Sequence, residues 1–440
     1  MSISPRLSCI YLAFRKFEVV NAKRKKPGTI ALGVSLLAGL SSPLFSQQAR
    51  APEMLSLREA LAQCVISNPI LEAARERTGS AEGLRQQAAL KPNPRLTIVN
   101  ENARAWEFST PFRFAHSTDT WAYVSQTFER GAKLRSRIDF AAAGVDRAEA
   151  ERSLAMVAIR ARVAAAYWNA AAAARITALY REDLGAFEQI VEYNRQRVRE
   201  GAAAGADLLR IEVERDRLVA NERRAEQDAD AARIALLREM GRQDFPAIQL
   251  TESLELLDPP AVTTAAEALE HRQEIRVARV AIRQQEKSAA LQRANALVDP
   301  EIGFGYKRTA GLDGIYAGIN IPLPVRNRNQ GNIAAAEADT RIAQKELDAL
   351  GIRIRAEVEA AQLNYAAKKA ALEQTIVPLR ERAREAERIA LAAYREGGVE
   401  LLRFLDAERV RIDTETLYYR SLAELQQSIV DLKVAEGKEL

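Results

Sequence analysis

Histidine and cysteine are the residues with which a chain does most of its acid–base and metal chemistry, and this 440-residue sequence has few of them. Its histidines are His116 and His271, and its cysteines are Cys9 and Cys64. Their spacing matches no zinc, copper or cobalt site. His271 and Glu274 fall on one helical turn, but no third ligand accompanies them. Phosphate-binding loops and nucleophile motifs are also missing. We therefore predict no metal site, no cofactor and no enzymatic activity.

The positive net charge of the chain comes from its N-terminal segment. The sequence carries 64 basic and 59 acidic residues. Residues 1–46 hold seven of the basic residues and one of the acidic ones, which leaves 57 against 58 in the remainder. Those remaining charges alternate in sign along the chain and form no basic block. We therefore predict that the protein does not bind nucleic acid.

Residues 1–46 have the pattern of an export signal. A basic stretch at 23–26 precedes an apolar run at 29–40, and small residues follow as far as Ser46. An apolar run of about 12 residues is too short to span a bilayer but suits the core of a signal peptide. We predict a signal peptide over 1–46, with an uncleaved anchor as the alternative. Its removal would leave Cys64 as a lone, buried thiol without an intrachain disulfide.

The elements that would position any site come in two copies. Residues 199–215 align without a gap with residues 395–411 and share an Arg-Glu-Gly triplet, a leucine and a glutamate. Repeated plans of this kind indicate duplicated structural units. We predict repeat 1 over 54–245 and repeat 2 over 265–437, joined by a proline-containing linker at 246–264.

Each repeat has the same order of predicted elements, beginning with a helix and ending with very long helices. The first helices are expected at about 57–89 and 265–296, and each stops at a proline-containing turn. The long helices follow residues 131 and 325. The helix expected over 133–199 would be roughly 100 Å long at 1.5 Å per residue. Each long helix turns at a glycine-marked loop, and dense alanine allows close coiled-coil packing.

Between the first helix and the long helices, the apolar period changes from 3.6 to 2. Ile302, Phe304 and Tyr306, for example, share one face. The four predicted strands are residues 94–103, 119–128, 300–309 and 314–323. Their length and pattern are typical of membrane β-strands, with an ordinary soluble sheet as the alternative. An interfacial aromatic girdle is predicted from Trp106, Phe108, Phe112, Phe114, Trp121 and Tyr316.

Four strands determine the expected assembly. A membrane barrel needs about eight strands or more, and open sheet edges are not tolerated in lipid. Several chains must therefore share one barrel, and three copies supply twelve strands. We predict a mainly α fold with a small β part, in which a trimeric 12-stranded β-barrel stands on a periplasmic α-helical barrel.

The sequence resembles the TolC family of outer-membrane efflux factors over residues 54–437. The resemblance is carried by Leu57-Arg58-Glu59-Ala60-Leu61, Asn68-Pro69, Ile321-Pro322-Leu323-Pro324, Tyr394-Arg395-Glu396-Gly397 and Leu405-Asp406-Ala407-Glu408. The segments 323–332 and 90–94 resemble the CzcC-like branch of heavy-metal efflux channels.

This resemblance implies a passive, gated channel subunit in the outer membrane that extends into the periplasm. It also implies a homotrimer that works with a periplasmic adaptor and an inner-membrane pump, and exports heavy-metal cations. Multidrug export and type I protein secretion are the alternatives within the family. A periplasmic adaptor and a coiled-coil structural protein are the alternatives from other classes.

The family pattern also assigns roles to six positions near the glycine-marked loops. Motif match places the periplasmic entrance at Asp207, Arg403 and Asp406, and the adaptor-docking tips at Gly201, Tyr394 and Gly397. Arg403 stands where drug-efflux members have the first of two acidic residues. Asp406 would then form a ring of three carboxylates in a trimer, and such rings set ion selectivity. Helix capping is the alternative role for Asp207 and Asp406.

Overall fold

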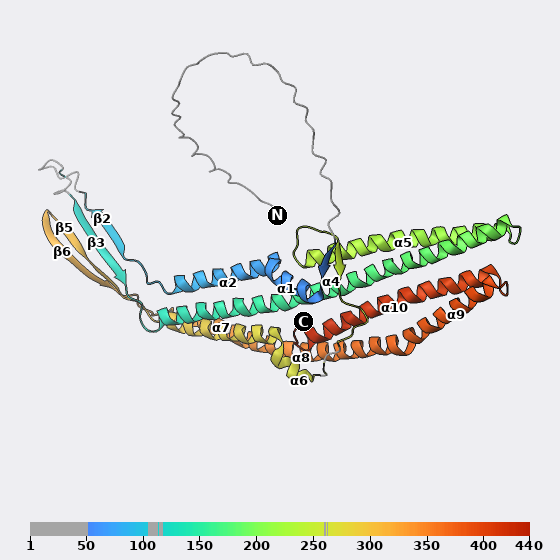
Figure 1. Cartoon of the computed structure of the whole chain (residues 1–440). Coiled ribbons are helices and arrows are strands. Elements are labelled where there is room, and N and C mark those ends of the chain that lie inside the picture. Colours follow the sequence, from blue (N-terminus) through green and yellow to red (C-terminus); the bar gives the residue numbers. More distant parts are fainter. Residues whose placement is uncertain (1–51, 104–112, 114–117, 259–260, 262) are drawn as a thin grey trace, which may run out of the picture. The chain divides into compact units, whose positions relative to one another are not determined.

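The computed structural model describes residues 52–103, 113, 118–258, 261 and 263–440 (Figure 1). The predicted signal peptide over 1–46 lies outside the described residues. So do His116 and four of the predicted girdle residues, Trp106, Phe108, Phe112 and Phe114. Within the described ranges, none of the helices combines the length and the apolar character needed to cross a bilayer.

The described chain is mostly helical, and its elements occur twice in the same order. The first series contains α1 (Leu57–Ser67), α2 (Pro69–Ala88), β2 (Arg95–Glu101), β3 (Asp119–Thr127), α4 (Lys133–Arg199) and α5 (Gly205–Glu239). The second series contains α6 (Ala265–His271), α7 (Gln273–Asn295), β5 (Glu301–Thr309), β6 (Leu312–Asn320), α8 (Gln330–Ala371), α9 (Val377–Arg395) and α10 (Leu401–Ala435). The helices α4 and α5 form hairpin 1, and α9 and α10 form hairpin 2.

The helix predicted over 57–89 is in fact two helices. Asn68 has extended backbone angles (φ −77°, ψ 119°), because the residue before a proline is disfavoured in the α conformation. The Asn68 side chain accepts a hydrogen bond from the N–H of Ile70 and so caps the new helix that starts at Pro69. The single break comes from one Asn-Pro pair.

The helix predicted over 265–296 is also divided, at Arg272. This residue is extended (φ −66°, ψ 126°), and its buried guanidinium donates to the carbonyl oxygens of Val434 and Ala435, both at 3.2 Å. Arg272 thereby satisfies orphan carbonyls at the C-terminal end of α10. No proline marks this break, which is why the sequence pattern did not predict it.

The long helical run that follows the strands of the second series contains a π-helical turn. Residues Leu372–Ile376 form this turn between α8 and α9, and Pro378 follows in the first turn of α9. A proline within a helix removes one backbone hydrogen bond and crowds the preceding turn. A single π turn accommodates that disturbance without ending the helix.

Four strands form one antiparallel sheet in the order β2-β3-β5-β6. Strand β6 covers 312–320 rather than the predicted 314–323. It begins early because Ala310 (φ 52°) and Gly311 (φ 80°) make a two-residue turn directly after β5. It ends early because the segment after Asn320 contains Pro322 and Pro324, which have no N–H for a strand ladder.

The segment predicted as a linker, 246–264, contains a short strand of its own. Strand β4 (Ile248–Leu250) pairs in parallel with β1 (Glu53–Leu55). The hydroxyl of Tyr167 on α4 lies beside this pair, and it donates to the carbonyl oxygen of Leu55 at 3.1 Å and to Glu252. The two-stranded sheet therefore fastens both the start of the described chain and the junction between repeats to the middle of α4.

Helix α4 is the central packing element. It contacts α2, α5, α7 and α10, and Figure 1 shows α5 beside it along its C-terminal half. A large apolar cluster surrounds Tyr167 and Trp168 of α4 and includes Tyr418 and Leu425 of α10. A second cluster lies nearer the hairpin turns. Its buried members are Phe187, Val191, Ile211, Leu218, Tyr394, Leu401, Phe404, Leu405 and Ile412.

Candidate functional site at the hairpin turns and the sheet

The two hairpin turns are built by the same hydrogen bonds. Gly397 (φ +76°) donates to the carbonyl oxygen of Tyr394, and Gly398 donates to that of Ala393. Gly201 (φ +74°) and the residue after it repeat this pattern at the end of α4. This is the Schellman arrangement, which closes a helix with a left-handed residue that is usually glycine. Gly201 and Gly397 therefore have a clear conformational role, since side chains strain a backbone at positive φ.

Tyr394 faces the other hairpin rather than solvent. Its side chain is 6% exposed, and its ring stacks on Phe404 with centroids 5.6 Å apart. Its hydroxyl donates a hydrogen bond to the amide oxygen of Asn194 on α4. Burial raises the pKa of Tyr394, and the nearby charge of Asp207 adds to that rise. The residue thus ties α9 to α4 directly below the turns.

The three predicted entrance residues lie close to the turns but do not contact one another. Asp207 is partly exposed in the first turn of α5, and its side chain makes no capping hydrogen bond. Arg403 and Asp406 are exposed on α10, and Asp406 lies beyond that helix's first turn. Over the described ranges, none of the three forms an ion pair. Neither side chain makes a capping hydrogen bond, but Asp207 does occupy the first turn of α5, where a carboxylate interacts favourably with the helix dipole.

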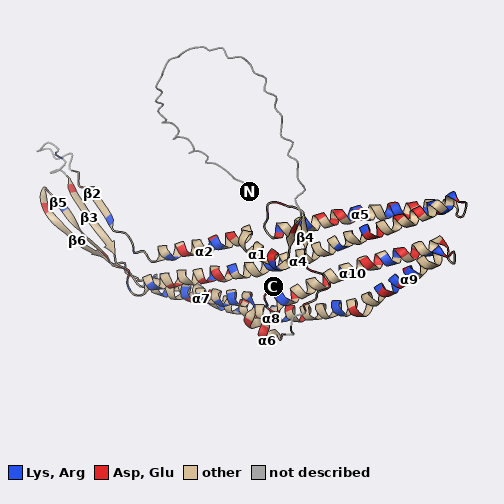
Figure 2. Cartoon of the chain, in the orientation of Figure 1, with Lys and Arg blue, Asp and Glu red and all other residues tan. Residues whose placement is uncertain are grey.

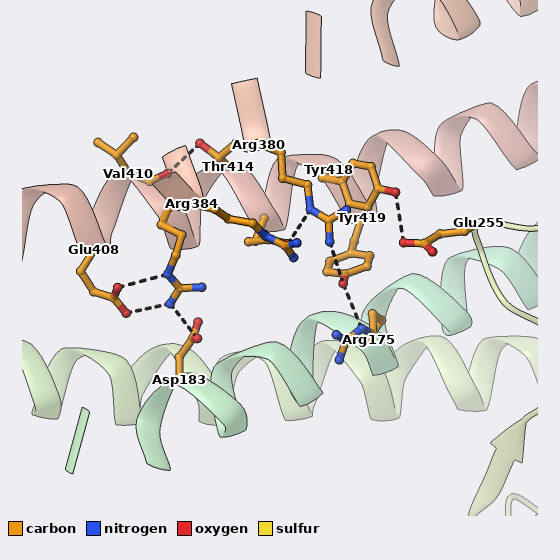
Figure 3. Close-up of polar contacts among 12 residues, drawn as sticks. Arg175, Asp183, Glu255, Arg380, Arg384, Glu408, Val410, Thr414, Tyr418 and Tyr419 are labelled. Atoms are coloured by element: carbon orange, nitrogen blue, oxygen red, sulfur yellow. Dashed lines mark hydrogen bonds and ion pairs between the residues drawn. The ribbon is translucent and has the colours of Figure 1, made fainter. Parts of the chain in front are cut away.

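A buried charged cluster joins the two hairpins further along α4. The Arg411 guanidinium on α10 lies 2.7 Å from Asp183 of α4 and 2.7 Å from Glu408 of its own helix. Figure 3 shows Asp183 and Glu408 facing each other across this contact. Their side chains are 9% and 11% exposed. In the part of the chain that the structure describes, Arg411–Asp183 is the one ion pair between α4 and α10.

This cluster holds more acid than base. Burial raises the pKa of Asp183 to about 6, even though the neighbouring Arg411 lowers it, and the charge of Glu408 contributes to the rise. Glu387 on α9 also has a raised pKa, first because of burial and then because of Glu408. Burial alone would lower the pKa of Arg411, but the hydrogen bonds to Glu408 and Asp183 and the charges of these two carboxylates together outweigh that effect and raise it. The cluster is therefore poised to take up a proton.

A second buried carboxylate lies about two helical turns beyond Glu408 on α10. Glu415 is 1% exposed and pairs with two arginines of α9, Arg380 at 2.9 Å and Arg384. Arg380 also lies 3.8 Å from the ring centre of Tyr418. The Tyr419 hydroxyl accepts from Arg175 of α4 at 3.1 Å (Figure 3). This network fastens α9 to α10 and reaches α4.

At the sheet, one face is apolar and exposed. The β-register places alternate side chains on it, and Figure 2 shows that the strands carry little charge compared with the helices. Each of the following side chains is at least 48% exposed: Leu96, Ile98, Val124, Phe304, Ile315 and Ile319. A contiguous exposed apolar surface of this kind marks a membrane or protein contact.

The opposite face of the sheet is aromatic and more polar. The Tyr123 and Tyr316 rings lie 4.5 Å apart, and Trp121 lies 5.6 Å from Tyr316. The Lys307 amine sits 4.1 Å from the centre of the Trp121 ring. Gly305 permits this packing, because a Cβ there would lie 2.3 Å from the Tyr123 backbone.

The residues examined for metal binding are not brought together. Over the described residues, no group of three or more His, Cys, Asp or Glu side chains is placed to hold a metal ion. His271 ends α6, while Glu274 pairs with Arg272 at 2.9 Å. Cys64 is buried on α1, and burial raises the pKa of its thiol.

Sequence reasoning missed the buried polar residues between the hairpins. Asp183, Glu408, Arg411 and Glu415 look like ordinary members of charged helical faces, because charged residues occur throughout these helices. A buried side of α10 was detectable in principle, since Phe404, Leu405 and Ile412 share the spacing of Glu408 and Glu415. This spacing identifies the buried face of α10 but does not identify the residues of other helices that pair with Glu408 and Glu415.

The chain is similar to known proteins along nearly its whole length. A family model described as outer membrane efflux protein matches residues 60–242. The cobalt-zinc-cadmium resistance protein CzcC of Cupriavidus metallidurans is 26% identical over 403 residues, which are 90% of this chain and 93% of CzcC. A membrane protein structure from Pseudomonas aeruginosa has a TM-score of 0.72 at 22% identity, over 87% of this chain and 90% of that one. The structure of CusC, described for its transmembrane channel formation, has a TM-score of 0.71 at 16% identity, over 90% and 96%.

Proposed function

We propose that this chain, which belongs to the outer membrane efflux protein family, forms the gated outer-membrane duct of a three-component export system. It is an outer-membrane efflux channel protein of the CzcC type. The observation that carries the proposal is the sheet, which leaves an uncharged apolar face open and continues directly into helices of great length. Family members and structural relatives of this kind are channels rather than enzymes.

We propose a homotrimer with a shared 12-stranded barrel. The strands β2 and β6 are the edges of the four-stranded sheet, so each has one unpaired row of backbone groups. Lipid cannot satisfy such groups, and pairing with a neighbouring copy would. By the alternation of strand directions, β6 of one copy would run antiparallel to β2 of the next. The long helices would then make a helical barrel on the periplasmic side.

For the cargo, we propose heavy-metal cations, on the basis of the name of CzcC and the segment 323–332 that resembles its branch. Multidrug export and type I protein secretion are the alternatives. The chain has few metal-binding side chains, so the pump and the periplasmic adaptor would select the cargo and this subunit would only conduct it. No nucleic acid or cofactor takes part in this proposal.

We propose that the hairpin turns are the periplasmic end. Gly201 and Gly397 close the helices at the tips that meet the adaptor. The hydrogen bond from Tyr394 of α9 to Asn194 of α4 joins the two hairpins next to these tips. Asp207, Arg403 and Asp406 would line the entrance of the trimer. Their unpaired, partly or fully exposed charges are available to a passing ion or to a neighbouring copy.

The test is fractionation followed by complementation. The mature protein should be recovered from the outer membrane as a trimer that resists unheated detergent electrophoresis. Expressed with its cognate pump and adaptor, it should restore growth of a sensitive strain on cobalt, zinc and cadmium. Recovery as a soluble periplasmic protein would favour the adaptor or coiled-coil alternatives. A trimer that restores drug resistance but not metal resistance would contradict the proposed cargo.

A further inference from the structure

The two hairpins contact each other mainly through α4 and α10, with further contacts from α5 and α9. Below the turns, the α4–α10 interface contains the apolar residues around Phe187 and Phe404 and the Arg411–Asp183 ion pair, and the Tyr394–Asn194 hydrogen bond joins α9 to α4 beside it. Any widening between the hairpins must separate these groups. The ion pair is the component whose strength can change with conditions, because both partners are charged groups removed from water.

The cluster around that ion pair is unbalanced in charge and incompletely hydrogen-bonded. Three carboxyl groups, Asp183, Glu387 and Glu408, gather around Arg411. Arg411 reaches only one oxygen of Asp183, and the other, Oδ2, is buried without a hydrogen-bond partner. A buried carboxylate oxygen with no donor is costly. A carboxylic acid OH at that position would remove the charge that causes the cost.

Among the described residues, the cations on the surrounding elements other than Arg411 act on other carboxyl groups. On α4 itself, Glu182 pairs with Arg175, and Arg181 pairs with Glu222 and Glu226 of α5. Also on α5, Glu214 faces α10, where it pairs with Arg409, and Arg217 pairs in turn with Glu214. On α9, Arg395 acts on Glu387, and Arg384 is taken by Glu415.

We propose that Asp183 is a proton-operated lock between the hairpins, which holds the α4–α10 interface together when the carboxyl is protonated and loosens it when the proton leaves. The site binds a proton, and the structural change that follows its loss is a widening of the α4–α10 interface. The lock is a property of the chain itself. Only its consequence for conduction rests on the proposed channel function.

The direction of the effect follows from linkage. The pKa of Asp183 is raised from an ordinary value of 3.8 to about 6 in the packed interface. Its stabilising contribution is therefore fully present below pH 3.8 and is lost as the pH rises through about 6. The ratio of closed to separated interface should change by at most about a hundredfold across that range. Acid closes the hairpins, and neutral pH loosens them.

The experiment measures the interface directly, in the full-length trimer with Cys64 replaced by alanine. Spin labels are attached at Gln189→Cys on α4 and Leu402→Cys on α10, which are exposed positions. Distance distributions recorded from about pH 3.5 to about pH 7.5 should broaden toward longer distances as the pH rises, with a midpoint between pH 3.8 and about 6 and little further change above that. Asp183→Asn keeps the shape of the protonated acid, so its distribution should stay narrow at every pH.

Two further variants make the assignment specific. Glu408→Gln removes a neighbouring negative charge and frees Arg411 for Asp183, so the midpoint should move to lower pH. Asp216→Asn alters an exposed acid of α5 that pairs with Arg215, and it should leave the wild-type midpoint in place. A wild-type distribution that does not change with pH would overturn the proposal, as would an Asp183→Asn protein that still broadens.

Bilayer recordings separate this proposal from the proposed function. The wild-type conductance should rise as the pH increases from 3.8 to about 6, and Asp183→Asn should show no such rise. A protein that forms no pores but retains the pH-dependent distances would contradict the channel and leave the lock intact. Distances that do not depend on pH, in a protein that conducts, would contradict the lock alone.

Discussion

The two hairpins turn in the same way but return along very different helices. Gly201 and Gly397 close α4 and α9 with the same pair of hydrogen bonds. Beyond the turns, α5 buries only apolar residues, whereas α10 buries Glu408, Glu415 and Gln426 as well. The duplicated sequence therefore preserves the turn, while of the two returning helices only α10 buries polar and charged side chains. Two contacts between the hairpins pair a residue of hairpin 2 with a buried polar residue of α4: Tyr394 with Asn194, and Arg411 with Asp183.

Replacing Glu415 of α10 should give the largest difference in the free energy of unfolding between matched substitutions in the two hairpins. Glu415→Ala would leave Arg380, which is only 16% exposed, without its carboxylate partner. Breaking a buried ion pair by removing one partner costs about 3 kcal/mol or more. We expect a loss of that size in the free energy of unfolding, measured by denaturant titration of the solubilised protein. Asp216→Ala on α5 is the matched control, and its exposed pair should contribute less than about 1 kcal/mol. Equal losses in the two variants would remove the contrast between the helices.

Tyr394 should give the next largest effect. Tyr394→Phe keeps the stack on Phe404 but leaves the amide oxygen of Asn194 without its donor in a buried site. The expected cost is about 1–2 kcal/mol, with a higher single-channel conductance because the tips are less firmly joined. Tyr193→Phe, at a neighbouring residue of α4 that is 40% exposed, is the control and should change neither quantity. A Tyr394→Phe protein with wild-type conductance would show that this tie does not restrain the entrance.

The turn glycines test the similarity of the hairpins rather than their difference. Gly201→Ala and Gly397→Ala each force a side chain into the left-handed region, although there is space for the methyl group at both positions. We expect each to cost about 1 kcal/mol, seen as a similar fall in the unfolding temperature. Gly185→Ala, inside α4 with open space around it, should instead stabilise by about 0.5–1 kcal/mol. Unequal effects at the two turns would mean that one tip is held by contacts that the other lacks.

The features that the sequence predicted correctly depend on interactions between residues close together in the chain, and the features that it missed depend on distant partners. The glycine turns, the period-2 strands and the Asn68-Pro69 break depend on local chemistry, and local chemistry is visible in a sequence. The predicted single helix over 57–89 was wrong because it was drawn through Asn68-Pro69 without a break, although the residue before a proline disfavours the helical conformation. The division at Arg272 and the pairing of β1 with β4 depend on partners far away in the chain. The Asp183–Arg411 contact joins residues 228 positions apart, so no local pattern contains it.

The smallest effects on stability should come from the predicted entrance residues, and there the readout is conduction. Arg403 and Asp406 are exposed and unpaired over the described residues, so replacing either with alanine should change the free energy of unfolding by less than about 0.5 kcal/mol. If they converge on the axis of a trimer, their charges act on passing ions with opposite sign. Asp406→Ala should then weaken block by divalent cations in planar bilayers, and Arg403→Ala should strengthen it. Asp207→Ala supplies the comparison from hairpin 1, and it should also weaken block by divalent cations, as Asp406→Ala does.

Unchanged conductance and block in all three variants would show that these residues do not line the entrance. The Tyr394 tie and the Asp183 lock would then remain as the groups that control the opening between the hairpins.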